Sequence, residues 1–177
     1  MHSYIYLASQ SPRRQELLHQ IGVKFELLLA DASEDAEALE THIPHESALS
    51  YVERVTLAKL DAAEQRLLKR QLPWAPILCA DTTVAIVLND KEIILGKPED
   101  EADAKRILQL LSGKTHQVHT AIALLANQGS KPKVLVSSSS VTFKSLSDAE
   151  IDAYIASKEP MGKAGAYGIQ GIAGSLI

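Results

Sequence analysis

The sequence is poor in cysteine and has no long apolar run. Its one cysteine, Cys79, permits no intrachain disulfide and no cysteine-rich zinc site, which is consistent with a reducing cytoplasm. No apolar run approaches the roughly 18 residues of a membrane span, and the N-terminus lacks the basic-then-apolar order of a signal peptide. We therefore expect a cytoplasmic protein without membrane association.

Positive charge and aromatic residues are also scarce. The net charge is −4, and aromatic residues, which would stack on bases, make up 5% of the chain. A general nucleic-acid binder is more often basic, so stable nucleic-acid binding is not expected, and an anionic ligand would need a local cluster of cations. Hydrophobic residues make up 46% of the 177 residues, enough to bury a core, so we expect one domain with room for two lobes.

Alternating strand and helix patterns predict an α/β protein with a mixed sheet. Strands are predicted at 4–8, 25–29, 77–80, 83–88, 92–95, 116–126 and 133–143. Helices are predicted from Pro12 to Gly22 and over 46–71, 100–112 and 147–157, with an acidic loop at 30–45. Asn89 and Asp90 are predicted to form a hairpin turn.

The segment LASQSPRR, residues 7–14, leads from an apolar strand into the start of a helix. Free backbone N–H groups and the helix dipole attract anions there. Ser9 and Ser11 add hydroxyl donors, and Ser11 can cap the helix. Arg13 and Arg14 add planar forks that suit phosphate oxygens. Spacing alone favours a phosphate site no more than a solvated arginine pair beside capping serines.

Asp81 and Lys59 are candidates for the chemistry. Asp81 directly follows an apolar strand, where a carboxylate can hold a metal ion or a water, although a turn aspartate bonded to its own backbone is commoner. Lys59 falls on the apolar stripe of the long helix, four residues after Val55. Its ammonium therefore either reaches solvent or points into a polar cleft, and the first is the usual case.

Three loops contribute further candidates. Lys97 lies in a stiff GKP turn, and Glu34 lies in an acidic run. Both patterns usually belong to solvent-exposed residues without a function, although one acidic side chain could help to hold a divalent cation. The segment GKAGAYGIQG, residues 162–171, is too rich in glycine for the interior of a helix or strand. It suggests backbone close to a ligand or a tight loop, with Lys163 and Gln170 as its functional side chains.

Two motif-like patterns are set aside. SGKT at 112–115 lacks the first glycine of a P-loop, because Leu108 stands in its place, and the segment ends a helix. His116 and His119 stand three residues apart on a predicted strand, so they point to opposite faces and cannot share a metal ion without distortion.

Taken together, these segments resemble the Maf family of nucleoside triphosphate pyrophosphatases. The matching pieces are LASQSPRR, the Lys59 helix, ADT, GKP, SGKTHQVHT and GKAGAYGIQG, in this order over nearly the whole chain. The resemblance is closest to the branch that acts on dTTP and UTP. Thr82 and Gln170 stand where the 7-methyl-GTP branch usually carries acidic residues. The implied fold is α/β, with a mixed twisted sheet, flanking helices and two lobes around a central cleft, similar to the inosine triphosphate pyrophosphatases.

The resemblance also implies residue roles. Asp81 is the implied catalytic acid–base residue, and Asp81 with Glu34 would hold Mg²⁺ or Mn²⁺, because oxygen ligands without Cys/His clusters favour these metals over zinc. The implied substrate-binding residues are Ser9, Ser11, Arg13, Arg14, Lys59, Thr82, Lys97 and Gln170. Of these, Arg13, Thr82 and Gln170 bear on the choice of base.

Two other functions stay open. One is the same reaction on another nucleotide, such as 7-methyl-GTP or a modified pyrimidine nucleotide. The other is a nucleotide-binding regulator of cell division or septum formation. Family members are often homodimers and continue past the equivalent of Ile177 with a further strand and helix. The resemblance therefore implies a single Maf-like domain over 1–177, from which this segment is either absent or merely left out.

Overall fold

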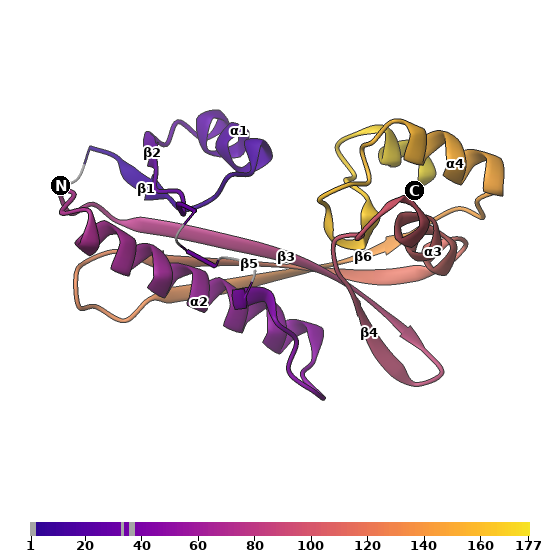
Figure 1. Cartoon of the computed structure of the whole chain (residues 1–177), viewed down its shortest axis with the longest axis horizontal. Coiled ribbons are helices and arrows are strands. Elements are labelled where there is room, and N and C mark those ends of the chain that lie inside the picture. Colours follow the sequence, from indigo (N-terminus) through magenta and orange to yellow (C-terminus); the bar gives the residue numbers. More distant parts are fainter. Residues whose placement is uncertain (1–2, 33, 36–37) are drawn as a thin grey trace. The chain divides into compact units, whose positions relative to one another are not determined.

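The computed structural model describes residues 3–32, 34–35 and 38–177 (Figure 1). Of the acidic loop predicted at 30–45, Ser33, Ala36 and Glu37 lie outside the described residues. The strands are β1 (Ile5–Leu7), β2 (Phe25–Leu27), β3 (Ile77–Leu88), β4 (Lys91–Leu95), β5 (Thr115–Leu125) and β6 (Lys133–Thr142). The α-helices are α1 (Pro12–Gln20), α2 (Ala48–Lys69), α3 (Glu101–Leu111) and α4 (Asp148–Ala156), and the 3-10 helices are η1 (Ala38–Glu40), η2 (Ala164–Ala166) and η3 (Ile172–Leu176).

The strands form one mixed sheet, as predicted. Its order is β2-β1-β3-β5-β6, and β4 pairs with β3 outside this path. β1 runs parallel to β2 and to β3, with Tyr6 opposite Ile77, whereas β3 and β4 are antiparallel. After β1 the chain leads directly into α1. The LASQSPRR segment therefore lies where a largely buried strand ends and a helix begins.

Strand β3 differs from the prediction. Two strands were expected, 77–80 and 83–88, with Asp81 just after the first. The structure instead has one strand from Ile77 to Leu88, and Asp81 and Thr82 lie inside it. The polar pair Asp81 and Thr82 predicts an interruption between two strands, but threonine favours strands. The Asp81 carboxylate is also paired with the Lys59 ammonium, which makes its partial burial tolerable.

Local sequence signals set most element boundaries as predicted. Ser11 caps α1 by accepting a hydrogen bond from the Arg14 N–H, and Pro12 is the first helical residue. Asn89 and Asp90 form the two-residue turn between β3 and β4, with φ angles of 49° and 60°. Ser147 and Glu150 form a capping box at the start of α4. These boundaries could be predicted because each depends on residues close in sequence.

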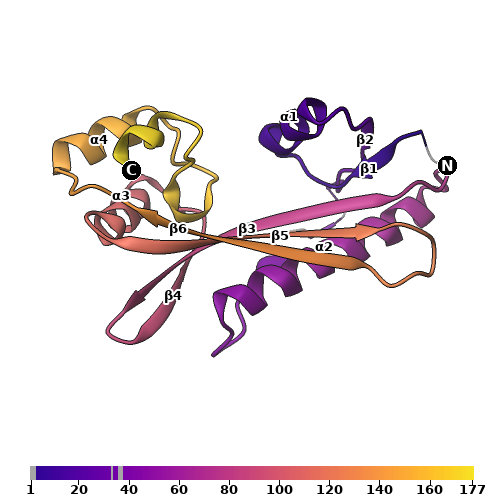
Figure 2. The same cartoon turned by 180° about the vertical axis from the view of Figure 1, so that it is seen from behind.

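The chain divides into two compact units, each with its own core. Unit 1 comprises Met1–Asp81 and Thr120–Val136. In this unit α1 and α2 lie on opposite sides of the strands (Figures 1 and 2). The core of unit 1 contains Tyr6, Leu28, Leu60, Leu67, Ile77, Cys79 and Leu125. Cys79 is fully buried, as expected of a packing residue, and burial raises the pKa of its thiol to about 12.

Unit 2 comprises Thr82–His119 and Ser137–Ile177. Its core contains Val84, Ile86, Ile107, Leu108, Phe143, Ile151, Tyr154 and Tyr167. The core therefore joins β3, α3, α4 and the glycine-rich segment. Of the helices in the part of the chain that the structure describes, none combines the length and apolar composition that a membrane span requires.

Candidate active site

The start of α1 gathers the first group of candidate residues. Ser9 follows β1 and is buried, and its hydroxyl oxygen accepts hydrogen bonds from the Ser11 N–H at 3.2 Å and from Nη1 of Arg14 at 3.1 Å. The guanidinium of Arg14 is therefore folded back against the end of β1. This places a positive charge beside the start of α1, where the helix dipole also attracts anions.

Arg13 and Arg14 occupy different surroundings. Arg14 is half-buried; burial lowers its pKa, and the negative charges of Asp81 and Glu40 oppose this effect. Arg13 makes an ion pair of 2.8 Å with Glu16, but its buried Nε has no hydrogen-bond partner among the described residues. An unpaired buried donor costs about 1–3 kcal/mol, a cost that an anionic ligand would remove.

Lys59 joins two carboxylates of unit 1. Its Nζ lies 2.7 Å from Oδ1 of Asp81 and 2.8 Å from Oε1 of Glu40, and all three side chains are half-buried. Burial by itself lowers the pKa of Lys59, but Asp81 and Glu40 outweigh it and raise the pKa above its ordinary value. The ammonium therefore stays charged and points to the acidic pair instead of reaching solvent.

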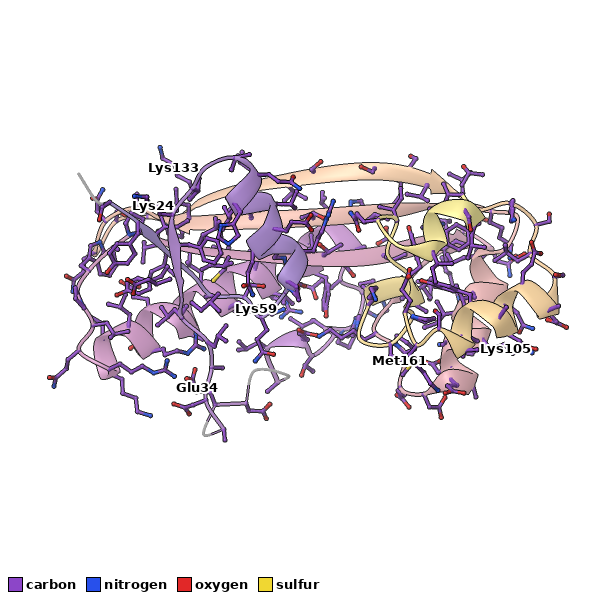
Figure 3. The ribbon with its side chains drawn as sticks, turned by 90° about the horizontal axis from the view of Figure 1, so that it is seen from above. Lys24, Glu34, Lys59, Lys105, Lys133 and Met161 are labelled. Carbon is purple, nitrogen blue, oxygen red and sulfur yellow. The ribbon has the colours of Figure 1, made fainter. Side chains whose placement is uncertain are left out.

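Glu34 lies elsewhere in unit 1. Arg66 on α2 is buried and donates from Nε and Nη2 to both carboxylate oxygens of Glu34, at 2.6–3.0 Å. It also donates from Nη1 to the carbonyl of Leu28 at 2.8 Å. These hydrogen bonds lower the pKa of Glu34, and in Figure 3 Glu34 and Lys59 lie apart. The structure thus places Glu34 on Arg66 and places Glu40 beside Lys59 and Asp81.

Sequence reasoning missed Glu40 and Arg66. Glu40 is one of several acidic residues in the 30–45 segment, and no local pattern distinguishes it from Glu34. Only the structure distinguishes it: η1 ends at Glu40, and the Glu40 carboxylate accepts a hydrogen bond from Lys59 on α2. Arg66 falls on the same helix as Lys59, seven residues later, so a shared helix face was the available signal for both cations.

The remaining candidates belong to unit 2. Thr82 follows Asp81 in β3, Lys97 follows β4, and Gln170 lies in the glycine-rich loop. This loop is held close to the GKP turn, because the Gly165 N–H donates to the carbonyl of Gly96 at 3.0 Å.

A glycine is required at position 165. Gly165 has a φ of +70°, and an added Cβ would lie 2.8 Å from Cγ2 of Val84 on β3. The loop backbone therefore packs directly on that strand.

The two histidines of SGKTHQVHT have separate partners. Nε2 of His116 lies 2.7 Å from the Tyr167 hydroxyl, while Nδ1 of His119 lies 2.7 Å from the Ser138 hydroxyl. His116 also packs against Phe143, and burial lowers its pKa to about 4. Its hydrogen bond to Tyr167 links the glycine-rich loop to β5.

The donor set nevertheless fits a hard divalent cation. Among the described residues there is no group of three or more His, Cys, Asp or Glu side chains that could hold a metal ion. However, the carboxylates of Asp81 and Glu40 both contact the Lys59 ammonium, so they lie close to each other. Two carboxylates completed by phosphate oxygens and water are a common environment for Mg²⁺.

Comparison with known proteins identifies the family to which the chain belongs. The family model described as "Maf-like protein" matches residues 4–177. The chain is 54% identical to the dTTP/UTP pyrophosphatase of Albidiferax ferrireducens and 53% identical to that of Cupriavidus pinatubonensis, each over the whole chain and 86% of the relative. It is 53% identical to the dTTP/UTP pyrophosphatase of Ralstonia nicotianae over 99% of this chain and 83% of that protein. Among solved structures, the Staphylococcus aureus Ham1 protein aligns with 79% of this chain and 71% of its own at a TM-score of 0.48 and 14% identity.

Proposed function

Since the chain belongs to the Maf family, we propose that it is a nucleotide diphosphatase that hydrolyses dTTP and UTP to the nucleoside monophosphate and pyrophosphate. The observation that carries the proposal is the Lys59 ammonium between Asp81 and Glu40. In this group a carboxylate that can accept a proton lies beside a cation that holds it in place. The negative charges of Asp81 and Glu40 also oppose the burial that lowers the pKa of Arg14 at the start of α1, so this second cation interacts with both carboxylates.

The phosphates bind at the start of α1 in this proposal. The helix N–H groups, the Ser9 and Ser11 hydroxyls and the two arginines supply donors and positive charge for phosphate oxygens. The unpaired Nε of Arg13 gains a partner when an anion binds. Lys97 in unit 2 adds a further cation in this proposal.

Asp81 acts as the proton acceptor. A water attacks the α-phosphorus, and its proton passes to Asp81. The bond from the α-phosphorus to the oxygen that bridges it to the β-phosphate then breaks, and the electron pair leaves on the pyrophosphate oxygen. The Lys59 ammonium holds Asp81 in place by donating a hydrogen bond to its Oδ1. Most of the rate enhancement in such reactions comes from positioning and electrostatic stabilisation.

A divalent cation, Mg²⁺ or Mn²⁺, is the proposed cofactor. Asp81 and Glu40 would hold it beside the Lys59 ammonium, because both carboxylates lie there, whereas Arg66 already binds Glu34 through both carboxylate oxygens. When bound, the cation supplies charge neutralisation for the phosphates. Glu40 thus takes the place that the resemblance assigns to Glu34.

The choice of base is proposed to depend on Arg13, Thr82 and Gln170. Support for this assignment is the identity to relatives named dTTP/UTP pyrophosphatases. We further propose a cytoplasmic location, in line with a single buried thiol, and a homodimer. Stable nucleic-acid binding is not proposed, in line with the net charge of −4.

The test is a product analysis with a panel of nucleoside triphosphates and Mg²⁺ or Mn²⁺, using wild type and Asp81→Asn. Monophosphate and pyrophosphate from dTTP and UTP, reduced 10²-fold or more in the variant (an order-of-magnitude expectation), support the proposal. Turnover of another nucleotide would keep the mechanism and contradict the base assignment. Tight binding without turnover of any nucleotide would favour the regulator of cell division.

A further inference from the structure

The carboxylate of Glu159 clamps the backbone just after Gln170. Glu159 lies between α4 and the glycine-rich loop, and its Oε2 accepts the Ile172 N–H at 2.9 Å. Its Oε1 accepts the Ala173 N–H at 3.3 Å and the Tyr154 hydroxyl at 3.0 Å. One side chain therefore fixes two successive residues of the loop to α4.

This contact replaces a missing helix cap. η3 begins at Ile172, and its N-cap residue is Gly171, which has no side chain to cap the helix. The first N–H groups of a helix lack partners inside the helix and attract negative charge. Glu159 supplies that charge from another part of the chain.

Gly171 and Glu159 fit each other. A Cβ added at position 171 would overlap the Glu159 carboxylate, so only glycine lets the carboxylate reach η3. Burial by itself raises the pKa of Glu159, but the Ile172 and Ala173 N–H groups outweigh it and lower the pKa. The clamp is therefore ionised at neutral pH, and its hydrogen bonds are charge-assisted.

Gln170 lies between two anchored segments. It is exposed, and it lies in a turn that the Gly171 N–H closes by donating to the Gly168 carbonyl at 3.0 Å. Before the turn, Tyr167 is fixed by His116; after the turn, Glu159 fixes Ile172. The direction of the Gln170 side chain thus depends on these two anchors.

We propose that Glu159 is a positioning residue for base selection, acting through Gln170. This inference rests on the proposed function, because it assumes that Gln170 reads the base of a bound nucleotide. An amide recognises a pyrimidine by directed hydrogen bonds, and a loop that moves by an ångström loses that direction. Loss of the clamp should therefore reduce selectivity more than turnover.

The experiment compares four variants with wild type. Glu159→Gln keeps the size of the side chain and removes its charge, Gly171→Ala displaces the same carboxylate from the other side, and Gln170→Ala removes the reading group. Ser147→Ala is the matched control, because it weakens the cap of α4 without touching the loop. For each, the ratio of kcat/KM for dTTP to kcat/KM for dCTP is measured, together with amide hydrogen exchange at Ile172 and Ala173.

We expect the ratio to fall about fivefold or more in the three loop variants and to stay unchanged in Ser147→Ala, since about 1 kcal/mol of lost discrimination corresponds to that factor. Exchange should be faster in Glu159→Gln. An unchanged ratio in Glu159→Gln, or one that shifts as much in Ser147→Ala, would overturn the inference. A wild type without nucleotide turnover would overturn the proposed function, and the role of Gln170 with it.

Discussion

At Lys59, one ammonium stabilises two half-buried carboxylates, and the three side chains come from three segments far apart in sequence. Without the cation, the carboxylates of Asp81 and Glu40 would repel each other. Lys59 thus has a chemical role even before substrate binds.

The carboxylate that serves the reaction can be identified with a matched pair of variants. Glu40→Gln should lower kcat for dTTP about tenfold or more and change the free energy of unfolding by about 1 kcal/mol or less, because partly exposed ion pairs contribute little. Glu34→Gln should leave kcat within a factor of about three but cost about 1–3 kcal/mol of stability, because buried Arg66 loses its partner. Saturating kinetics and urea unfolding of both variants measure this. If Glu34→Gln instead lowered kcat more than Glu40→Gln, Glu34 would be the carboxylate that serves the reaction.

His116 should make stability depend on pH. Its pKa is lowered from 6.5 to about 4 by burial, so between these values the unfolded chain binds a proton that the folded protein does not. The free energy of unfolding should therefore fall as the pH drops from 6.5 to 4, by at most about 1.4 kcal/mol per pH unit. Urea unfolding of wild type and His116→Phe at several pH values should show their difference shrinking in acid. His45→Asn, at an exposed position with a φ of 65°, is the control; a constant difference would contradict the buried neutral imidazole.

Single residues were predictable from sequence to different degrees. Asp81 and Lys59 could be chosen because an acid after an apolar strand and a lysine on an apolar stripe both break a local pattern. Glu40 and Glu159 break no local pattern, and their partners Lys59 and Ile172 lie 19 and 13 residues away. The site could thus be predicted where it violates local rules and not where it depends on tertiary pairing.

Among the elements, the β3–β4 hairpin offers the sharpest local test. Both turn residues, Asn89 and Asp90, have positive φ, which is the pattern of a type I′ turn. Asp90→Gly should keep or slightly raise stability, whereas Asp90→Val should lower it by about 1–2 kcal/mol, because a β-branched residue is strained at positive φ. Thermal and urea unfolding of the two variants measure this. Equal stability of both variants would show that the turn changes its conformation.

Element predictions succeeded where the controlling residues were neighbours. Caps at Ser11 and Ser147, and the turn at Asn89, depend on hydrogen bonds within a few residues. β3 was divided wrongly, because the partner that permits Asp81 inside a strand is Lys59, 22 residues earlier. The sheet order likewise depends on long-range pairing, such as Tyr6 with Ile77, which periodicity does not encode.

At the scale of the whole molecule, the charge opposes the proposed substrate. The protein carries a net charge of −4, so a triphosphate is repelled on average and must be held by local cations. Several cations are already paired with acids: Lys59 with Asp81 and Glu40, and Arg66 with Glu34. A divalent cation that accompanies the nucleotide would reduce this repulsion.

Metal removal should therefore weaken nucleotide binding as well as abolish turnover. With a non-hydrolysable dTTP analogue at about 100 times its Kd, the free energy of unfolding should rise by about 2.7 kcal/mol, which for a chain of this size raises the Tm by about 5–10 °C. The same analogue with EDTA should give a clearly smaller shift, because the triphosphate then faces Asp81 and Glu40 without a neutralising ion. Thermal unfolding with Mg²⁺, with Mn²⁺ and with EDTA measures this, and thymidine, which lacks phosphates, is the control. An equal shift with and without metal would show that the cations of the chain alone bind the phosphates and would remove the cation from the binding step.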